Sequence, residues 1–539
     1  MPDIDATDAP GRLDGTRPAR EIGVYVTLQW ERGNAVLTGI PRARFGHRLP
    51  RVASTTGDGV FAEWHWDGKR LVVENDRYGF YPLFWAALPA GGICVAPSLL
   101  TLIDQGAPTE LDIEALSVFF RLGFFVGDDT PFAAIRTVPP NAVFEWSRGV
   151  LTCRARYPVA PQVQNLSRDD AIDGYVDLFA NAVAKRLPSA GRSAVTISGG
   201  RDSRHILLAL HHAGVQPTMC VSALDNPPDA NQDPAIAAEL CRRLQWPHTV
   251  VEQRLSVFEA QLRKNIQTHF CAAAHGWYLA LADFLNGSFA YAYDGIAGDV
   301  LSQSIFLTRQ FDTAFRGNEP RIVARAVLAH MKTGYGGLQA LLGRKLRPAI
   351  DPDIAAGRLA REIERHLAWP NPSDAFGFWN RTRREIALAP YALLCGVPTV
   401  FAPFLDHALF DFLTALPVGM LIDRSFHSEA IARAYPAYAD VPYADQKHAA
   451  PVDDTVVRRR YIADAARYYA LRKPGTLARN AVPRVKALLG LTSAGRLHPT
   501  ISPLLIYLDQ LEGAMHRRTR IVTQPVPAHA SVKEGVHPS

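Results

Sequence analysis

The ten residues Ala194-Val-Thr-Ile-Ser-Gly-Gly-Arg-Asp-Ser203 decide the fold of this chain. The short apolar run Ser193–Ile197 predicts a strand, and Arg204–Ala213 predicts a helix, so two glycines fill the turn between them. A strand that leads through glycines into a helix places several backbone N–H groups around an anion, at the positive end of the helix dipole. This stretch therefore predicts a phosphate-binding loop.

The side chains of the loop favour a nucleotide together with magnesium. Gly199 and Gly200 allow the backbone to approach phosphate oxygens, and Ser198 and Ser203 can donate hydroxyl hydrogen bonds. Asp202 beside a phosphate indicates a cation between the two, and Mg²⁺ is the natural one. The pattern is not the Walker loop but the S-G-G-x-D-S signature of ATP pyrophosphatases. The alternative is an ordinary glycine turn capped by the aspartate and the second serine.

The chain on either side of the loop alternates between helix and strand. This alternation predicts βαβ units on a mostly parallel sheet, and the sequence beyond about 300 predicts mainly helices. The predicted segments are a helix at Arg168–Arg186, a strand at Thr218–Ser222, a helix at Ala235–Leu244 and a strand at His248–Val251.

The N-terminal part has a different pattern, with short β-runs separated by turn signals such as Thr56-Gly57-Asp58-Gly59. We predict disordered residues at 1–20, a sheet-rich domain at 21–160, an α/β domain at 168–515 and a disordered tail at 519–539. The predicted N-terminal elements are strands at Ile22–Leu28, Val60–Trp66 and Arg70–Glu74, a helix at Leu111–Arg121, and a hairpin of Asn141–Trp146 with Leu151–Arg156.

Composition excludes several classes of protein. The chain has 539 residues, 48% of them hydrophobic and 20% charged, which is ordinary for a globular protein. Its net charge of +6 is spread along the sequence, which favours a solvated surface over a nucleic-acid partner. The six cysteines form no CxxC pair, and we find neither a signal peptide nor an apolar run that could cross a membrane. We therefore predict a cytoplasmic protein with no nucleic-acid or membrane partner.

Further motifs resemble those of the asparagine synthetase family, which includes β-lactam synthetases and lasso-peptide macrocyclases. Each motif is similar to one of that family, and the resemblance covers about 55–450. The motifs are Asn75-Asp-Arg-Tyr-Gly-Phe-Tyr-Pro-Leu83 (R-D-x-x-G-x-x-P-L), Ile135-Arg-Thr-Val-Pro-Pro-Asn141 (I-x-x-L-P-P-G), Tyr293-Asp-Gly-Ile-Ala-Gly-Asp299 (G-x-G-x-D-E), Ala402-Pro-Phe-Leu-Asp406 (P-F-L-D), and Asp445-Gln-Lys447 followed by Pro451.

The resemblance implies a glutaminase-like, Ntn-type domain followed by an ATP-pyrophosphatase-like parallel α/β domain with many helices. It also implies that Asp202 and Asp299 hold Mg²⁺ and that Lys447 stabilises charge in the transition state. Val221 and Ser222 are our candidates for contact with the adenine of ATP, because ligands bind at the carboxyl edge of such sheets. Taken singly, Asp299 is also compatible with a turn residue, Asp406 with a helix N-cap and Lys447 with a surface lysine.

The reaction implied is the activation of a small-molecule or peptide carboxylate by ATP, with release of pyrophosphate and then of AMP as an amine forms the amide. The chain departs from the family pattern in two ways. The mature N-terminal cysteine of glutamine-dependent members has no counterpart, since the first cysteine is Cys94. We therefore expect a degenerate domain without glutaminase activity, whose amine comes from ammonia, a partner or the substrate.

The second departure lies in the loop at Gly295, where the family glutamate is Ile296 and the acid after the aspartate is Val300. Glu385 and Tyr391 are possible substitutes on later helices. Arg201 and Arg204 flank Asp202, and they are predicted either to bind extra substrate charge or to pair with nearby acids.

Several functions stay open at this point. The chain could be a macrolactam (lasso-type) cyclase, with a leader-processing protease and a precursor peptide as partners, or a ligase for a small acid. An ammonia-dependent asparagine synthetase is disfavoured by Ile296 and Val300. A degenerate nucleotide-binding scaffold is disfavoured by the intact loop. A tRNA thiolation enzyme would need reactive cysteines and a strongly basic surface.

Overall fold

The computed structural model describes residues 23–49, 57–155, 157, 159–225, 232–304, 308–317, 319–331, 334–335, 338–444, 455–470, 475–478 and 501–517. The predicted disordered ends, 1–20 and 519–539, lie outside the described residues. So do Lys447 and the motif around it.

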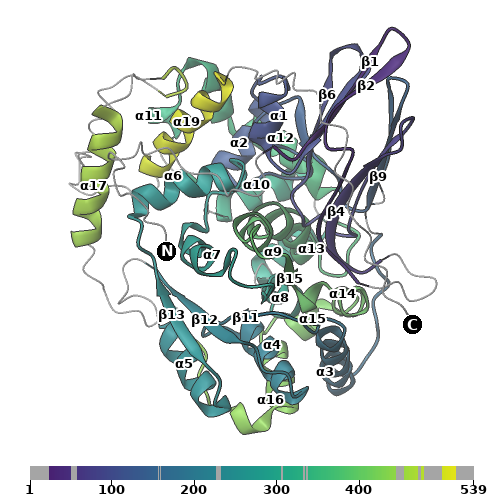
Figure 1. The fold of residues 1–539 in the computed structure, drawn as a ribbon. Helices are drawn as coiled ribbons and strands as arrows, with labels where there is room; N and C mark the ends of the chain where they lie inside the picture. Colours follow the sequence, from purple (N-terminus) through teal and green to yellow (C-terminus); the bar gives the residue numbers. More distant parts are fainter. Residues whose placement is uncertain are drawn as a thin grey trace, which may run out of the picture.

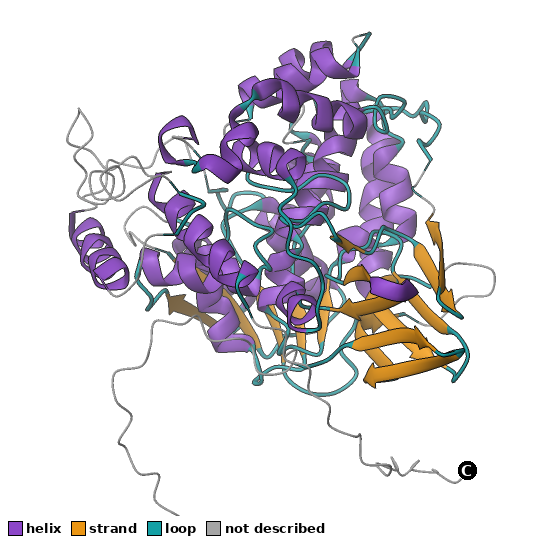
Figure 2. Ribbon diagram, turned by 90° about the horizontal axis from the view of Figure 1, so that it is seen from above, coloured by secondary structure: helices purple, strands orange, loops and turns teal. Residues whose placement is uncertain are grey.

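The N-terminal part forms two antiparallel sheets, each of five strands. The first has the order β2-β1-β7-β6-β8, and the second has the order β10-β9-β5-β4-β3. Figures 1 and 2 show these strands gathered at one end of the molecule, with most of the helices and a further sheet in the rest. The strands are β1 Val26–Glu31, β2 Asn34–Gly39, β3 Arg42–Arg48, β4 Gly59–Trp66, β5 Leu71–Asn75, β6 Phe84–Leu88, β7 Gly92–Ala96, β8 Ile135–Thr137, β9 Ala142–Ser147 and β10 Val150–Ala155.

The two sheets are held together by apolar residues at every second position, which is the period of a strand with one buried face. In β5, Leu71 and Val73 are fully buried, and Leu28 of β1 belongs to the same core. The rings of Trp30 and Trp146 meet edge to face across the core at 6.4 Å between centroids. The predicted sheet-rich region is therefore confirmed.

Of the next two helices, the first packs against β6 and β7 of the first sheet. Helix α1 spans Leu99–Asp104, and α2 spans Ile113–Leu122. The predicted helix at 111–121 begins two residues later than expected because Asp112 is its N-cap, where its Oδ1 accepts from the backbone N–H of Ala115 at 3.0 Å. The helix ends at Gly123, whose φ of 82° is the left-handed conformation of a C-terminal glycine.

The second part contains a five-stranded sheet whose strands are all parallel, in the order β13-β12-β11-β14-β15. In Figure 1, α3, α4, α5 and α16 lie on one face of this sheet and α7 lies on the other. The predicted mixed α/β fold with a parallel sheet is confirmed. The elements are α3 Arg168–Ala184, β11 Ser193–Thr196, α4 Arg201–His212, β12 Met219–Leu224, α5 Asp233–Leu244, β13 His248–Glu252, α7 Leu279–Leu285, β14 Tyr291–Tyr293, β15 Thr399–Phe401 and α16 Phe426–Ala434.

The order of these strands places a topological switch point, here called the crevice, between β11 and β14. From β11 the chain proceeds outward to β12 and β13 on one side, whereas β14 and β15 lie on the other. The loops that leave β11 and β14 therefore diverge at their carboxyl ends, which is where ligands bind to open parallel sheets.

The rest of the chain is mainly helical, as predicted. Its helices are α6 Val257–Gln267, α8 Gly298–Ser302, α9 Arg309–Phe315, α10 Pro320–His330, α11 Leu338–Leu341, α12 Pro352–Ile363, α13 Pro372–Phe376, α14 His407–Thr414, α15 Val418–Leu421, α17 Thr455–Ala470 and α19 Ile501–Met515. Two π-helical segments span Gly377–Ile386 and Ala389–Leu393. Short 3₁₀ turns lie at Pro89–Gly91, Gly276–Tyr278, Arg344–Ile350, Pro403–Leu405 and Pro436–Tyr438.

The motifs at Asn75–Leu83 and Ile135–Asn141 contact each other where the sheets meet the helical region. Asn75 donates to the carbonyl of Pro139 at 2.8 Å and accepts from the N–H of Ala142 at 2.9 Å. Gly79 has a φ of 63°, and a Cβ there would lie 3.3 Å from Nε of Arg383, which belongs to the first π-helical segment. These motifs therefore act as the joint between the two parts of the chain.

A buried ion network strengthens the same junction. Arg186 donates to Oδ1 of Asp58 at 2.8 Å and to Oδ2 of Asp406 at 3.0 Å, and both Arg186 and Asp406 are 1% exposed. Lys185 also reaches Asp406, at 2.8 Å, but it is 48% exposed. Asp406 is in addition the N-cap of α14 and accepts from the N–H of Ala408 at 3.1 Å. The P-F-L-D element therefore has a structural role.

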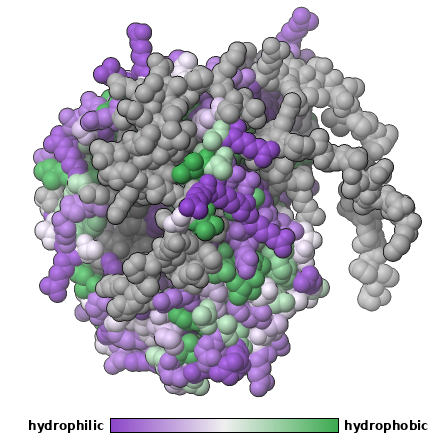
Figure 3. Space-filling view, turned by 90° about the vertical axis from the view of Figure 1, so that its left-hand side faces the viewer, coloured by the Kyte–Doolittle hydropathy of each residue, from purple (hydrophilic) through white to green (hydrophobic). Residues whose placement is uncertain are grey.

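The outer surface carries mixed side chains. On the face shown in Figure 3, hydrophilic and hydrophobic described residues alternate over short distances. Among the described residues, no helix has the length and apolar character needed to cross a bilayer.

Candidate functional site

The loop predicted to bind phosphate lies at the crevice, between β11 and α4. Its two hydroxyls are turned back onto its own backbone. The N–H of Ser198 donates to Oγ of Ser203 at 3.0 Å, and the N–H of Gly200 contacts Oγ of Ser198 at 3.2 Å. Gly200 is the N-cap of α4 and has no side chain to cap that helix. The loop is thus closed into a compact turn at the positive end of α4.

One backbone N–H of this loop already donates a hydrogen bond to a carboxylate. The N–H of Gly199 donates to Oδ1 of Asp233 at 2.7 Å, and Asp233 is the first residue of α5. A Cβ at position 199 would lie 2.7 Å from Cβ of Ala444 and 3.0 Å from the same aspartate oxygen, so only glycine fits. An acidic oxygen bound to a loop amide shows that this amide can hold an anion.

The second loop of the crevice leaves β14 and packs directly against Asp202. A Cβ at Gly295 would lie 2.8 Å from Cβ of Asp202, and a Cβ at Gly298 would lie 2.6 Å from its Cγ. Asp294 accepts from the hydroxyl of Tyr278 at 2.7 Å and from the N–H of Ile296 at 2.8 Å, which fixes the turn. The two glycines therefore allow α8, with Asp299, to approach Asp202.

Asp202 and Asp299 form a pair of carboxylates with little neutralising charge. Burial raises the pKa of Asp202 well above its usual range, and the charge of Asp299 raises it further. Burial also raises the pKa of Asp299, although Arg381 acts against this. Gln303 donates to Oδ1 of Asp202 at 2.9 Å, which supplies a hydrogen bond but no charge. The charge of Arg201 acts against the shift of the pKa of Asp202 without abolishing it.

These two side chains fit Mg²⁺. Among the described residues, no three His, Cys, Asp or Glu side chains come close enough together to hold a metal by themselves. Mg²⁺ is typically bound by one or two carboxylates together with waters and substrate phosphates. A pair of carboxylates beside a loop whose amide already binds a carboxylate oxygen therefore has the donor chemistry that magnesium on a phosphate chain requires.

The histidines near Asp202 do not supply the missing charge. Nδ1 of His427 lies 3.4 Å from Oδ1 of Asp202, but burial lowers the pKa of His427 well below its usual range. Burial also lowers the pKa of His205, to about 3, and its Nδ1 lies 3.1 Å from Nε2 of His427. Both imidazoles are neutral at physiological pH and act as hydrogen-bonding groups.

Within the described residues neither Arg201 nor Arg204 forms an ion pair with an acid, although the charge of Arg201 acts to lower the pKa of Asp202. Arg204 is 1% exposed and donates to the carbonyls of Val441, at 2.7 Å, and Pro442. Both guanidinium groups lie over the ring of Tyr443, at 4.3 Å for Arg201 and 4.0 Å for Arg204. Helix α4 therefore fixes the segment that leads toward Lys447, and nothing in the local sequence shows this.

The two residues predicted to contact adenine lie in the middle of β12, which runs on to Leu224. Val221 is fully buried, and its carbonyl accepts from the N–H of Ile197 at 2.9 Å. The hydroxyl of Ser222 donates to the carbonyl of Ile197 at 2.8 Å and contacts Nε2 of His248 at 2.8 Å. Both residues therefore support the phosphate loop through hydrogen bonds to the backbone of Ile197, and Ser222 is 1% exposed.

The proposed replacements for the family glutamate lie on the π-helical segments. Oε1 of Glu385 accepts from the N–H of Ala274 at 3.2 Å, and burial raises its pKa, although the nearby charge of Arg381 opposes this shift. The hydroxyl of Tyr391 has no hydrogen-bond partner within the described ranges. Ile296 and Val300 are both buried among apolar neighbours. Arg381 thus acts electrostatically on both Glu385 and Asp299.

The first cysteine of the chain is structural. Cys94 lies in β7, is fully buried and accepts a hydrogen bond from the hydroxyl of Thr27 at 3.2 Å. Burial raises the pKa of its thiol to about 12. A thiol with this pKa is not a nucleophile at neutral pH.

Comparisons with known proteins agree with the sequence motifs over part of the chain. Residues 44–157 match the model of a glutamine amidotransferase domain family. A glutamine-hydrolyzing asparagine synthetase 3 of Bacillus subtilis (strain 168) is 28% identical over 155 residues, which is 28% of this chain and 25% of that protein. The aligned stretch thus spans a quarter of the relative's length.

Two solved structures show weaker likeness. The allosteric regulatory enzyme of purine biosynthesis matches with a TM-score of 0.14 and 11% identity, over 38% of this chain and 51% of the other. The glutamine phosphoribosylpyrophosphate amidotransferase from B. subtilis matches with a TM-score of 0.15 and 8% identity, over 42% and 62%. Scores this low carry no conclusion about the fold. The matched domain and the curated relative, together with the motifs above, show that this chain is similar to the asparagine synthetases and that residues 44–157 match a glutamine amidotransferase domain.

Proposed function

We propose that this chain is an ATP-dependent carbon–nitrogen ligase that adenylates a carboxylate and transfers the acyl group to an amine. The observation that carries the proposal is the approach of Asp202 and Asp299 to each other beside the loop Ser198–Ser203, at the carboxyl edge of the parallel sheet. This combination serves one need above all, which is to hold the phosphates of a nucleotide through a divalent cation.

The reaction has two steps in this proposal. A carboxylate oxygen attacks the α-phosphorus of ATP, the bond to the bridging oxygen of the β-phosphate breaks, and pyrophosphate leaves with the electron pair. The nitrogen of a neutral amine then attacks the acyl carbon, AMP leaves, and the amine loses a proton. When bound, Mg²⁺ would neutralise the charge of the pyrophosphate.

The chain's own residues mainly provide position and charge. Asp202 and Asp299 would hold the cation, while the N–H groups of Gly199 and Gly200 would bind phosphate oxygens. Arg204 fixes the segment Val441–Tyr443, which immediately precedes the residues around Lys447. We retain Lys447 as the candidate for stabilising charge in the transition state, although it lies outside the described residues.

The amine is proposed to come from a source other than glutamine hydrolysed by this chain. Cys94 is buried with a raised thiol pKa, and burial also raises the pKa of Cys153, on the strand β10. Macrolactam formation on a precursor peptide released by a leader-processing protease is one form of this proposal, and ammonia-dependent synthesis of asparagine is another. Glutaminase activity of the purified chain would contradict it.

The proposal is tested by exchange of radiolabelled pyrophosphate into ATP, with a panel of carboxylic acids and peptides. Exchange that depends on one class of acid, followed by release of AMP when an amine is added, is the expected result. Release of ADP with any acid would overturn adenylation. Tight binding of a non-hydrolysable ATP analogue without exchange by any acid would leave a nucleotide-binding scaffold as the function.

Replacing Asp233 with alanine is expected to strengthen the binding of magnesium pyrophosphate. In the wild type its carboxylate occupies the N–H of Gly199 and adds negative charge beside the loop. Removing the carboxylate frees one hydrogen-bond donor and abolishes one electrostatic repulsion. The affinity for magnesium pyrophosphate should therefore rise by about three- to tenfold. Isothermal titration calorimetry measures this directly.

The matched control is Asp353→Ala, which also removes an acid from the first turn of a helix, α12, at an exposed position. It should leave pyrophosphate binding unchanged. If Asp233→Ala weakens binding, the carboxylate is part of the site and not a competitor of the anion.

A further inference from the structure

A pocket lined largely by aromatic side chains adjoins the helix that carries Asp299. Val300 and Leu301, the next two residues of α8, form part of its wall. Its empty space is about 330 Å³ with the open mouth included, which suits a small chemical group and excludes a nucleotide. The pocket therefore begins one residue away from the candidate magnesium ligand.

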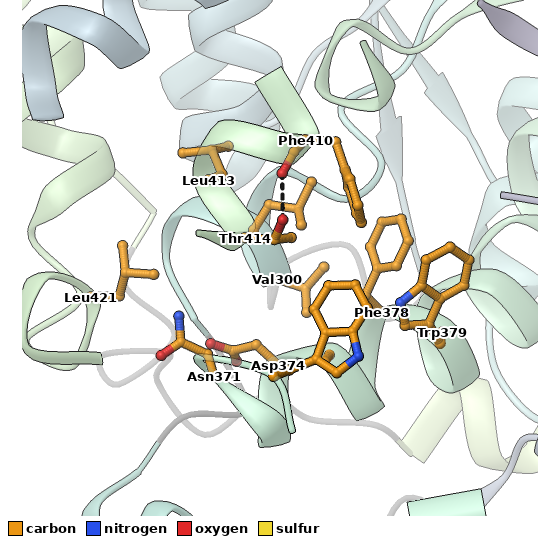
Figure 4. A pocket seen from close by; sticks show the side chains of 12 residues that line it. Val300, Asn371, Asp374, Phe378, Trp379, Phe410, Leu413, Thr414 and Leu421 are labelled. Carbon is orange, nitrogen blue, oxygen red and sulfur yellow. Dashed lines mark hydrogen bonds between the residues drawn. The ribbon is translucent and has the colours of Figure 1, made fainter. Parts of the chain in front are cut away.

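One end of the pocket presents only hydrogen-bond acceptors. Figure 4 shows the side chains of Asp374 and Asn371 next to each other at this end. Asp374 is 7% exposed and Asn371 is 6% exposed. The amide nitrogen of Asn371 donates to the carbonyl of Leu416 at 3.0 Å, so its oxygen is the atom left over. Within the described ranges, that oxygen and both carboxylate oxygens of Asp374 lack a hydrogen-bond partner.

The charges around Asp374 do not offset the cost of burying its carboxylate. Burial raises its pKa to about 7, and the negative charges of Asp299 and Asp312 act in the same direction. The hydroxyl of Ser304, which lies near Asp374 without hydrogen-bond geometry, and the charge of Arg424 act against this shift without abolishing it. A buried carboxylate with this environment is costly, so a partner that brings N–H groups and positive charge would be strongly favoured there.

The walls of the pocket fit the same partner. Trp369, Phe378, Trp379 and Phe410 line it, and Figure 4 shows Phe378, Trp379 and Phe410 on the side away from Asn371. The faces of aromatic rings attract cations, most of all where water is excluded. Acceptor oxygens at one end and aromatic faces along the side are the features of a site for an ammonium or guanidinium group.

We propose that this pocket binds a cationic nitrogen group of the substrate and makes Asp374 a specificity-determining residue. The inference rests on the proposed ligase function, since it assigns the cation to the substrate whose carboxylate is activated beside Asp202 and Asp299. The substrate class is then a carboxylic acid or peptide that also carries an ammonium or guanidinium group near the reacting carboxylate. That group is held by its charge and is distinct from the amine that attacks the acyl carbon.

The test uses small probes, because the pocket accepts the head group alone. Methylguanidinium and methylammonium are titrated into the full chain, with methylurea as the neutral isostere of the first, and binding is followed by saturation-transfer NMR of the methyl protons. We expect at least one cation to bind about tenfold more tightly than methylurea. Equal binding of methylurea and both cations, or no binding of any probe, would overturn the proposal.

Asp374→Asn should remove this preference for a cation while the binding of a magnesium–ATP analogue stays within about twofold of wild type. Asp353→Asn, an exposed aspartate on α12, should leave both properties unchanged. Leu421→Phe, which fills the pocket from another wall, is a second variant that should also block the cations. Unchanged cation binding in both pocket variants would refute the assignment.

The two proposals fail separately. If the wild type binds the cations through Asp374 but does not bind the ATP analogue, the pocket stands and the ligase function falls. If it binds the analogue with magnesium and exchanges pyrophosphate but does not bind the cations, the ligase function stands and the pocket has another role.

Discussion

Asp202→Asn is expected to weaken the magnesium-dependent binding of a non-hydrolysable ATP analogue by about 100-fold or more. The substitution keeps the volume of the side chain and the hydrogen bond from Gln303, and it removes the charge that would hold the cation. Calorimetry with and without magnesium separates this loss from any effect on the nucleotide alone. The control Asp283→Asn, whose partner is Arg263 at the surface, should bind like the wild type.

The same variant should become more stable, which a purely structural role for Asp202 does not predict. Burial and Asp299 raise the pKa of Asp202, so the folded state holds a proton on this group more tightly than the unfolded state. Its contribution to stability is therefore present at low pH and lost as the pH rises through the folded pKa. At neutral pH the asparagine variant should melt at a higher temperature than the wild type. A lower melting temperature together with unchanged binding of the analogue would contradict our assignment.

Arg186→Met is expected to reduce the free energy of unfolding by about 3–5 kcal/mol, because it leaves the buried carboxylate of Asp406 without its main partner. Arg186 also joins Asp58 of the N-terminal part to Asp406 of the second part. Lys185→Met is the matched control, since it removes another partner of Asp406 that is half exposed, and it should cost less than about 1 kcal/mol. Urea denaturation of the three proteins measures both values. Equal losses of unfolding free energy in the two variants would contradict the larger contribution assigned to Arg186.

The pH dependence of this network has a definite sign. Burial alone would raise the pKa of Asp406, but Arg186 and Lys185 lower it to about 2. A lowered folded pKa means that the stabilisation is present above the usual pKa of an aspartate and is lost as the pH falls toward 2. Acid should therefore narrow the difference in stability between wild type and Arg186→Met. A difference that stays constant from neutral pH down to 2 would show that lost packing, and not the ion pair, causes the destabilisation.

Local sequence predicted the elements around the phosphate loop closely. The strand predicted at 193–197 and the helix predicted from 204 appear as β11, which ends at Thr196, and α4, which begins at Arg201. The signal is strong there because the change from an apolar run to glycines and then to helical spacing falls within ten residues. The helix at 168–186 was equally clear, since Ile172, Tyr175, Phe179 and Val183 follow helical spacing and are all buried.

Contacts between distant segments were beyond such reasoning. Asp233 is an ordinary acid at a helix start in the sequence, and only the pairing of β11 with β12 brings it to the N–H of Gly199. The sequence did not single out Asp374, and its pocket exists only because α8, α13, α14 and a π-helical segment meet. Arg204 was predicted to bind substrate charge or pair with an acid, whereas it binds backbone carbonyls. Side-chain chemistry was thus readable from sequence, but its partners were not.

The joint between the two parts of the chain has a consequence for how this protein can be altered. One continuous core includes Val26 and Trp64 of the antiparallel sheets as well as Val195 and Phe404 of the second part. A fragment that begins at the linker near 160 would expose the apolar surface that these sheets now cover, and it should aggregate. The amidotransferase-type domain would then be needed to cover the apolar core of the second part, whatever reaction it does or does not perform. Engineering of the proposed ligase site should start from the intact chain.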